Sequence, residues 1–388
     1  MNTPERPLAH LLDSTEDSGP VHFGPNWFAA VMGTGIVPTA AVLLPYHVPG
    51  LHAVAVVVWA LAAGLLGVLV VATVVHWLRS PHQARRYGHD STMAQFYGAP
   101  PMAFMTVGAG TIIVASSVIS MRVAVDLDWV LWTIGTVTGL LSATIIPYRL
   151  FTSITVRPDG AFGGWLMPIV PPMVSASTGA LLLAHVASPG ARATLFYALF
   201  AEFGMSLVVA LAIITLIWSR LAHYGSSMSG RVPTLWIVLG PVGQSITAAG
   251  LLGANAALAV PAPLARAFSL FAILYGVPMW GFALLWATLA LAITVRTARS
   301  HLPFSLTWWS FTFPVGVTVT GTIRLAAETG LSAFRVASAV GLVALVGAWA
   351  TVAVRTARAA HREALLAHPT PTAAAGVKAG ALATSSAA

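Results

Sequence analysis

Residues 26–37 read NWFAAVMGTGIV, an uncharged apolar stretch that passes through a short run of small residues ending at Gly35. Four later stretches carry a similar run, and the closing glycines recur every 69–75 residues. A near-constant period of this length indicates a repeated supersecondary unit. Each interval is long enough for two membrane-spanning helices and their turns. The closing glycines are Gly35, Gly110, Gly179, Gly250 and Gly321.

The composition of the chain is that of an integral membrane protein. Of its 388 residues, 57% are hydrophobic and 8% are charged, whereas soluble domains carry about 25% charged residues. The chain has no cysteine, which excludes thiol nucleophiles and cysteine-ligated metal sites. The formal net charge is +8, but the arginines sit at predicted helix ends and not in one basic domain. Nucleic acid is therefore not a predicted partner.

Turn signals divide the chain into five helical hairpins. No Asp, Glu, Lys or Arg occurs between Ser18 and Leu78, and the only break is a turn at 45–50 bounded by proline and glycine. The predicted fold class is an all-α integral membrane protein, with ten transmembrane helices arranged as five hairpins around a quasi-fivefold central pore. We place the helices near 24–44, 51–78, 97–120, 128–150, 162–186, 192–220, 233–256, 265–295, 304–324 and 334–356.

Arginines are more frequent in the connections on one side of this arrangement. The positive-inside rule then places both termini in the cytoplasm of a multi-pass plasma-membrane protein. We divide the chain into an N-terminal tail (1–22), a ten-helix transport domain (23–358) and a C-terminal tail (359–388). The last segment is rich in Ala and Ser, which predicts disorder.

The odd-numbered predicted helices carry proline, which removes a backbone donor and kinks a helix. A freed carbonyl is costly in lipid, so broken helices belong where protein or water surrounds them. We therefore predict that the odd helices form an inner ring and the even helices an outer one. Proline is also common in membrane helices generally, which is the competing interpretation. The predicted kink residues are Pro38, Pro101, Pro172, Pro241 and Pro314.

The predicted inner helices carry neutral polar groups and no acidic residue. A cation path is expected to use carboxylates or ordered carbonyl rings. A hydroxyl-lined path with arginine at its mouths therefore favours anions. The alternative is that each Ser or Thr bonds only its own helix or a neighbour. The predicted pore-lining residues are Thr34, Gly35, Thr106, Gly110, Ser177, Gly179, Gln244, Thr247, Gly250, Thr318 and Gly321.

Two ionisable residues have two interpretations each. Glu202 is the one carboxylate that we place deep within a span, where it serves either as a proton site coupled to transport or as a packing residue. Arg324 ends the ninth predicted helix, where it either attracts anions to the extracytoplasmic mouth or anchors the helix at the interface. No histidine pair has the spacing of a metal motif, and the chain has no GxxxxGK[ST] sequence. No metal or cofactor is therefore predicted.

Five segments together resemble the tellurite-resistance/dicarboxylate transporter family, which includes plant slow-type anion channels, fungal sulfite exporters and malate permeases. The resemblance spans roughly 24–356. It implies five hairpins around a pore, a homotrimer with one pore in each subunit, and a gating phenylalanine on the ninth helix. The Thr-Phe-Pro context assigns the gate to Phe313, with Phe311 as the alternative, and ordinary core packing competes with both. The segments are NWFAAVMGTGIV (26–37), HDSTMAQFYGAPPMAF (89–104), GGWLMPIVPPMVSASTGALLLAH (163–185), LGPVGQSITAAGLLG (239–253) and WWSFTFPVGVTVTGT (308–322).

The expected function is transport of small anions, with the anion and the lipid bilayer as partners and no enzymatic activity. The leading substrates are a C4-dicarboxylate such as malate, and oxyanions of the sulfite or tellurite type. Three alternatives stay open. One is a proton-coupled carrier that uses Glu202. The second is a membrane-embedded enzyme, which would need ionisable groups converging from several helices. The third is a structural or sensory subunit with a blocked axis.

Overall fold

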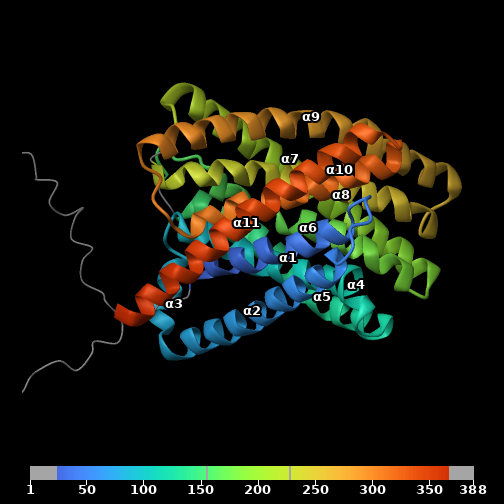
Figure 1. Ribbon diagram of the computed structural model, residues 1–388, viewed down its shortest axis with the longest axis horizontal. Coiled ribbons are helices and arrows are strands. Elements are labelled where there is room, and N and C mark those ends of the chain that lie inside the picture. Colours follow the sequence, from blue (N-terminus) through green and yellow to red (C-terminus); the bar gives the residue numbers. More distant parts are fainter. Residues whose placement is uncertain (1–23, 154–155, 227–228, 367–388) are drawn as a thin grey trace, which may run out of the picture. The chain divides into compact units, whose positions relative to one another are not determined.

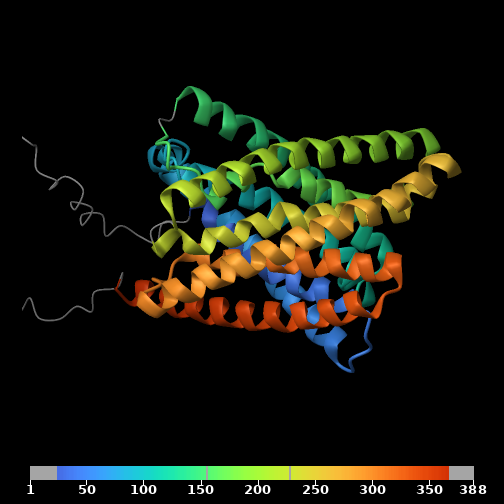
Figure 2. The same cartoon turned by 90° about the horizontal axis from the view of Figure 1, so that it is seen from above.

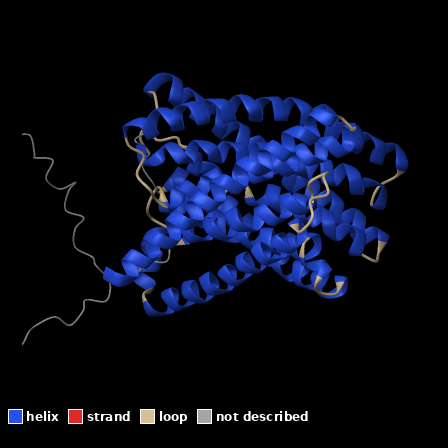
Figure 3. Ribbon diagram, in the orientation of Figure 1, coloured by secondary structure: helices blue, strands red, loops and turns tan. Residues whose placement is uncertain are grey.

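Short helices alternate with long ones along residues 24–153, 156–226 and 229–366, the part of the chain that this computed structural model describes. Figure 3 shows only helices and loops in that part. One additional short helix, α3 (Pro81–Tyr87), was not predicted. The short helices of the repeat are α1 (Phe28–Val42), α4 (Ala99–Ile113), α6 (Pro171–Leu182), α8 (Leu239–Asn255) and α10 (Phe313–Thr329). The long ones are α2 (Leu51–Arg79), α5 (Met121–Thr152), α7 (Pro189–Tyr224), α9 (Ala262–Ser300) and α11 (Ser332–Leu366).

A 3₁₀ segment precedes each short helix, and proline marks the change to α-helix. Pro101, Pro172, Pro241 and Pro314 all lie in the first turn of their α-helices. N–H groups in the first turn of a helix have no acceptor within the helix, so the N–H that proline lacks costs no hydrogen bond there. Proline therefore starts these helices and does not kink them. Pro38 lies inside α1, as a kink residue would. The segments are η2 (Pro25–Trp27), η3 (Met93–Gly98), η5 (Gly163–Leu166), η7 (Ser229–Val238) and η9 (Leu306–Phe311).

Local signals fix the ends of several helices, long and short, and some of these ends lie beyond the predicted bounds. Ser120 and Ser188 cap α5 and α7, because each hydroxyl accepts the N–H three residues on. Gly330 ends α10 with φ of 70°, a left-handed conformation that glycine adopts without strain. Helix α11 runs to Leu366 and so enters the predicted tail at 359–388. The predicted tail at 1–22 and the chain after 366 lie outside the described residues.

The five short helices form a closed ring of contacts. Helix α1 contacts α4, α4 contacts α6, α6 contacts α8, α8 contacts α10, and α10 contacts α1. Each of α1, α4, α6 and α8 also contacts the long helix that follows it. This ring lies within the compact unit Phe23–Ala353. In Figure 1 the long helices α9 and α2 run along opposite margins, and in Figure 2 the long helices α5 (green) and α11 (red) lie toward opposite margins.

Burial separates the two classes of helix. The most apolar windows of Met93–Ser117 and Ser229–Leu258 are 78% and 94% buried, whereas those of the five long helices are only 22–28% buried. Long apolar helices with such exposed surfaces fit a lipid environment. By length and hydropathy, seven helices in the described part of the chain qualify to cross a membrane. This agrees with the predicted all-helical membrane class.

The predicted number of ten spans is not established by these criteria. Helices α1, α6 and α10 have 15, 12 and 17 residues, and a helix needs about 20 residues to cross a bilayer. Their preceding 3₁₀ segments account for much of the missing length, since the sequence interval predicted as one helix is divided in two. The ten-span count therefore stays a prediction.

Candidate functional site

A cavity of about 80 Å³ lies where the five short helices meet in their C-terminal halves. The lining residues of each helix lie mostly three or four positions apart, so each helix presents one face to the cavity. Hydroxyl groups and aliphatic side chains share the lining. We call it the hydroxyl cavity; its residues are Ile36, Thr39, Leu43, Thr106, Ala109, Ile113, Val174, Ser177, Thr178, Leu181, Gln244, Thr247, Leu251, Thr320 and Arg324.

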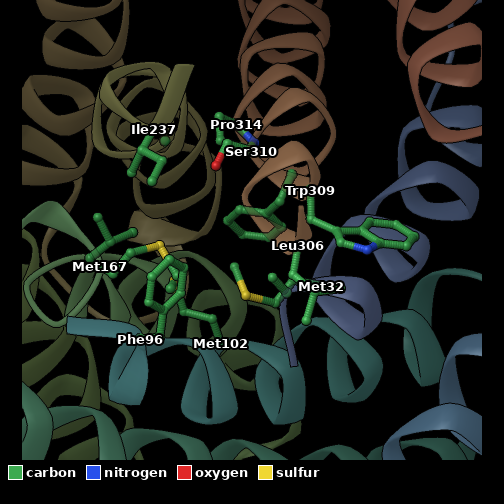
Figure 4. A pocket seen from close by; sticks show the side chains of 13 residues that line it. Met32, Phe96, Met102, Met167, Ile237, Leu306, Trp309, Ser310 and Pro314 are labelled. Atoms are coloured by element: carbon green, nitrogen blue, oxygen red, sulfur yellow. The ribbon is translucent and has the colours of Figure 1, made fainter. Parts of the chain in front are cut away.

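A smaller cavity of about 30 Å³ lies nearer the N-terminal ends of the same helices. Its lining is almost entirely apolar, and Figure 4 shows Met32, Phe96 and Met167 converging on it from different segments. A volume of this size holds only one or two water-sized groups. We call it the methionine cavity; its residues are Ala29, Met32, Phe96, Met102, Met167, Val170, Ile237, Gly240, Leu306, Trp309, Ser310, Phe313 and Pro314.

The two cavities are lined by consecutive turns of the same helices, on the same helix face. Met102 lines the smaller cavity and Thr106 the larger, and the same holds for Val170 and Val174. Residues four positions apart on a helix point in nearly the same direction. Met32 with Ile36, and Gly240 with Gln244, repeat the spacing in α1 and α8.

The structure separates the two candidate gate residues. Phe313 begins α10, is only 5% exposed and lines the methionine cavity. Phe311 packs edge-on against Trp236, with the ring centroids 5.7 Å apart, and lines neither cavity. Of the two, only Phe313 lines a cavity enclosed by the short helices.

Four of the predicted pore residues line the hydroxyl cavity, namely Thr106, Ser177, Gln244 and Thr247. Hydrogen bonds of Ser177, Gln244 and Thr247 join neighbouring helices of the ring. The side-chain amide of Gln244 donates to the hydroxyl of Ser177, which links α8 to α6. The hydroxyls of Thr247 and Thr320 lie 2.9 Å apart, which links α8 to α10.

Two other predicted threonines face away from both cavities. The hydroxyl of Thr34 accepts a hydrogen bond of 3.2 Å from the indole of Trp349 on α11. The hydroxyl of Thr318 donates to the carbonyl of Pro314 on its own helix. These two residues therefore support contacts within and between helices.

The five repeat glycines lie at helix contacts and line neither cavity. A Cβ atom on Gly110 would lie 2.4 Å from Trp59 of α2, and one on Gly179 would lie 2.6 Å from Leu199 of α7. Small residues allow membrane helices to approach closely, and this requirement explains the glycine period. The placement differs from the predicted place on the anion path. The remaining three glycines, likewise against other helices, are Gly35, Gly250 and Gly321.

Arg324 is the only ionisable residue among the described residues that line the hydroxyl cavity. Its aliphatic stem passes Gly250, where an added Cβ would lie 3.0 Å from Arg324 Cβ. No hydrogen bond or salt bridge to its guanidinium occurs in the described ranges, although the charge of Glu328, one turn later on α10, acts on it. By contrast, the hydroxyls of Thr106 and Thr178 donate to carbonyls of their own helices. Arg324 thus offers the cavity its uncommitted donors.

Glu202 lies behind the ring and lines neither cavity. Its carboxylate lies beside the hydroxyl of Ser175 on α6, and Glu202 Oε2 is buried without a hydrogen-bond partner among the described residues. The hydroxyl of Ser175 lies 2.7 Å from that of Thr136 on α5. The three side chains connect α7, α6 and α5. This arrangement supports the packing of the three helices. It also places the Glu202 carboxylate beside Ser175, the residue that follows Val174 of the cavity wall.

A second buried carboxylate, Asp128, was not among the predicted site residues. It is fully buried, and within the described residues neither of its oxygens has a hydrogen-bond partner. It packs against α4, where a Cβ on Gly108 would lie 2.5 Å from Asp128 Oδ1. The prediction failed because it started this helix near 128, whereas α5 begins at Met121 and carries Asp128 two turns inside.

Similarity to known proteins indicates the family of the chain. A protein-family model described as voltage-dependent anion channel matches residues 22–357. The chain belongs to the voltage-dependent anion channel family. This match confirms the resemblance drawn from the five sequence segments.

Relatives of this chain include transporters from an archaeon and from fungi. An uncharacterized transporter of Methanocaldococcus jannaschii is 28% identical over 302 residues, which cover 77% of this chain and 82% of the relative. A sulfite efflux pump of Arthroderma otae is 26% identical over 337 residues, covering 85% and 89%. A sulfite efflux pump of Trichophyton rubrum is 28% identical over 313 residues, covering 79% and 82%. Family and relatives support anion transport by a multi-pass membrane protein, and not an enzymatic activity.

Proposed function

We propose that the protein conducts small anions along the axis of the five-helix ring. The observation that carries the proposal is the hydroxyl cavity, whose described lining residues come from all five short helices and include one arginine and no carboxylate. A hydrogen bond between a guanidinium and an anion contributes about 1.5–3 kcal/mol. Arg324 supplies this interaction, and the neutral hydroxyls around it hold an anion weakly enough to release it.

The methionine cavity restricts passage on the other side of the hydroxyl cavity. An apolar constriction excludes water, and an anion that must shed its hydration shell cannot cross it readily. Phe313 forms part of this constriction, so its movement would admit water and anions. Gating by Phe313 is therefore part of the proposal.

A sulfite-type oxyanion is the first proposed substrate, and malate is the second. A cavity of about 80 Å³ with a single fixed cation suits a compact anion better than a doubly charged four-carbon acid. Sulfite is also the substrate in the names of the fungal relatives. The distribution of the arginines supports an orientation in the plasma membrane with both termini in the cytoplasm. The resemblance to the tellurite-resistance/dicarboxylate transporter family supports assembly as a homotrimer.

The test is flux through the purified full-length chain in proteoliposomes, with sulfite, malate, nitrate and chloride supplied in turn. We expect saturable anion flux, and we expect Arg324→Gln to raise the half-saturating sulfite concentration about tenfold, since one charged hydrogen bond is lost. Arg335→Gln is the matched control, because Arg335 is exposed on the neighbouring helix α11. No flux above empty vesicles for any anion, or equal effects of the two substitutions, would contradict the proposal.

A proton-coupled carrier is the second candidate, and the contact between Glu202 and Ser175 favours it. The same vesicles distinguish the two mechanisms when a pH gradient is imposed. Flux that follows the gradient and loses this dependence in Glu202→Gln would establish the carrier. Flux that follows the anion gradient alone, with Glu202→Gln unchanged, would establish the channel.

A further inference from the structure

A third and larger hollow, of about 440 Å³, lies at the ends of the segments that lead into the short helices. Three arginines line it: Arg157 before η5, Arg220 near the end of α7, and Arg231 in η7. It shares no lining residue with the methionine cavity or the hydroxyl cavity. We call it the arginine hollow.

The arginine hollow adjoins the methionine cavity along the chain. Trp165 lines the hollow and Met167, two residues later, lines the methionine cavity. Arg231 lines the hollow, and Ile237, six residues later in η7, lines the methionine cavity. The segments that carry Arg157 and Arg231 therefore continue into the constriction that precedes the hydroxyl cavity.

The positive charge of the hollow exceeds its negative charge. Asp159 is the only acidic residue among its described lining residues, and it pairs with Arg157, whose Nε lies 3.0 Å from Asp159 Oδ1. That solvent-exposed pair carries no net charge, and the carboxylate of Asp159 also acts on Arg220. Arg220 and Arg231 are half-buried and give the hollow its net positive charge. Like charges gathered around a concavity favour the binding of an anion there.

The guanidinium of Arg231 is held in place by two contacts. It lies over the ring of Phe162, 5.1 Å from the centroid, and its Nη2 donates to the hydroxyl of Thr92 at 3.4 Å. An arginine that merely anchors a helix at the membrane interface extends into solvent. Here an aromatic ring and a hydroxyl orient the group instead, and Ser91 adds a second hydroxyl to the same wall.

We propose that the arginine hollow binds a multivalent oxyanion and gathers anions at this mouth of the five-helix ring. The inference rests on the proposed transport function, and the positive-inside rule makes this mouth the cytoplasmic one. Planar guanidinium groups bind oxyanions through paired N–H donors, and several such groups select multivalent over monovalent anions. The site raises the local anion concentration and so favours export at low cytoplasmic concentrations.

Direct binding tests the site without any transport measurement. The full-length chain is placed in nanodiscs of zwitterionic lipid, and thermal stabilisation is recorded against inorganic pyrophosphate concentration. We expect Arg220→Gln/Arg231→Gln to raise the half-saturating concentration at least tenfold. Arg220→Lys/Arg231→Lys, which keeps both charges, should retain most of the binding and shows that the neutral pair has not simply unfolded the chain.

The matched control is Arg85→Gln/Arg86→Gln, two exposed arginines of α3 that do not line the hollow. This variant should bind pyrophosphate as the parent does. Equal weakening in both double variants would show a diffuse surface charge and overturn the proposal. Stabilisation by discs that contain anionic phosphatidylglycerol, without any by pyrophosphate, would assign the arginines to lipid headgroups and overturn it as well.

Flux measurements connect the site to transport. At low sulfite supplied from the arginine side, Arg220→Gln/Arg231→Gln should carry several-fold less flux than the parent, and at saturating sulfite the two should agree. Pyrophosphate binding without any anion flux would reject the proposed transport function and leave the site standing. Normal anion flux with unchanged pyrophosphate binding in the double variant would reject the site and leave the transport function standing.

Discussion

Phe311 and Phe313 have different surroundings because an α-helix begins between them. Phe311 ends the 3₁₀ segment η9, and Phe313 is the first residue of α10. Positions two apart in a helical segment point to nearly opposite sides. Phe311 therefore reaches Trp236, whereas Phe313 reaches the methionine cavity. The sequence identified both residues as gate candidates, and the helix start determines that Phe313 is the one that lines the methionine cavity.

Replacing Phe313 with alanine is expected to increase anion flux several-fold, because the ring occupies part of a narrow apolar constriction. The measurement is sulfite flux per reconstituted chain. The control is Phe311→Ala, which deletes a similar aromatic contact without widening the cavity. Loss of a large buried ring lowers stability by about 3–5 kcal/mol, so a thermal melt should accompany each flux value. Equal flux in the two variants would argue against the gate.

The polar residues predicted to line the pore differ in their surroundings for one reason. Thr106, Ser177, Gln244 and Thr247 line a cavity between the short helices, whereas Thr34 accepts a hydrogen bond from Trp349 of a long helix. Their place on an anion path stays a prediction. Residue type shows that a threonine suits a membrane helix. Which face of the helix it occupies depends on the neighbours of that helix, and these are distant in the sequence.

The 3₁₀ segments approach each other closely enough to require glycine. A Cβ atom on Gly163 of η5 would lie 1.8 Å from the carbonyl oxygen of Thr234 in η7, and one on Gly98 of η3 would lie 1.9 Å from that of Met167. The obstacle is backbone in both cases, which cannot move aside as a flexible side chain can. The second of these contacts involves Met167, which lines the methionine cavity.

Gly163→Ala is therefore expected to destabilise the protein by roughly 1–3 kcal/mol or more, as overpacking against backbone does. The matched control is Gly64→Ala, in the middle of α2, where an added Cβ meets nothing within 4 Å. That change should be neutral or stabilising by up to about 1 kcal/mol, because alanine favours helix more than glycine does. Thermal melts in detergent compare the two. A melting temperature for Gly163→Ala equal to that of the parent would contradict the steric argument.

The prolines show which properties of a helix the sequence predicts and which it does not. The odd-numbered predicted helices carry the prolines, and the structure divides each of them into a 3₁₀ segment and a short α-helix of the contact ring. The proline pattern did not reveal the position of this division. Proline in a first helical turn and proline inside a helix look alike in sequence, and the preceding 3₁₀ segment makes Pro314 a helix start.

At the scale of the whole molecule, tryptophans on the long helices connect one repeat to the next. The indole of Trp59 on α2 donates to α4, that of Trp132 on α5 to α6, and that of Trp280 on α9 to α10. Trp349 on α11 donates to Thr34 on α1, 315 residues away in sequence. This last bond joins the final repeat to the first and helps to close the ring.

Trp349→Phe is expected to lower stability by about 0.5–1.5 kcal/mol, the net contribution of one hydrogen bond, while keeping most of the aromatic packing. Trp77→Phe is the control, since Trp77 is 41% exposed on α2. Differential scanning of both variants in nanodiscs makes the comparison. If Trp77→Phe lowers the melting temperature as much as Trp349→Phe, the ring-closing bond contributes nothing measurable.

The sequence by itself determined the class of the protein: apolar segments without charge have no stable place outside a membrane. The glycine period determined the repeat, and the five segments indicated the family. Tertiary structure alone decided that the glycines pack against helices, that Arg324 faces a shared cavity, and that Arg157, Arg220 and Arg231 gather around one hollow. The physical reason is that composition acts locally, whereas the direction of a side chain depends on where its helix starts and on which distant helices surround it.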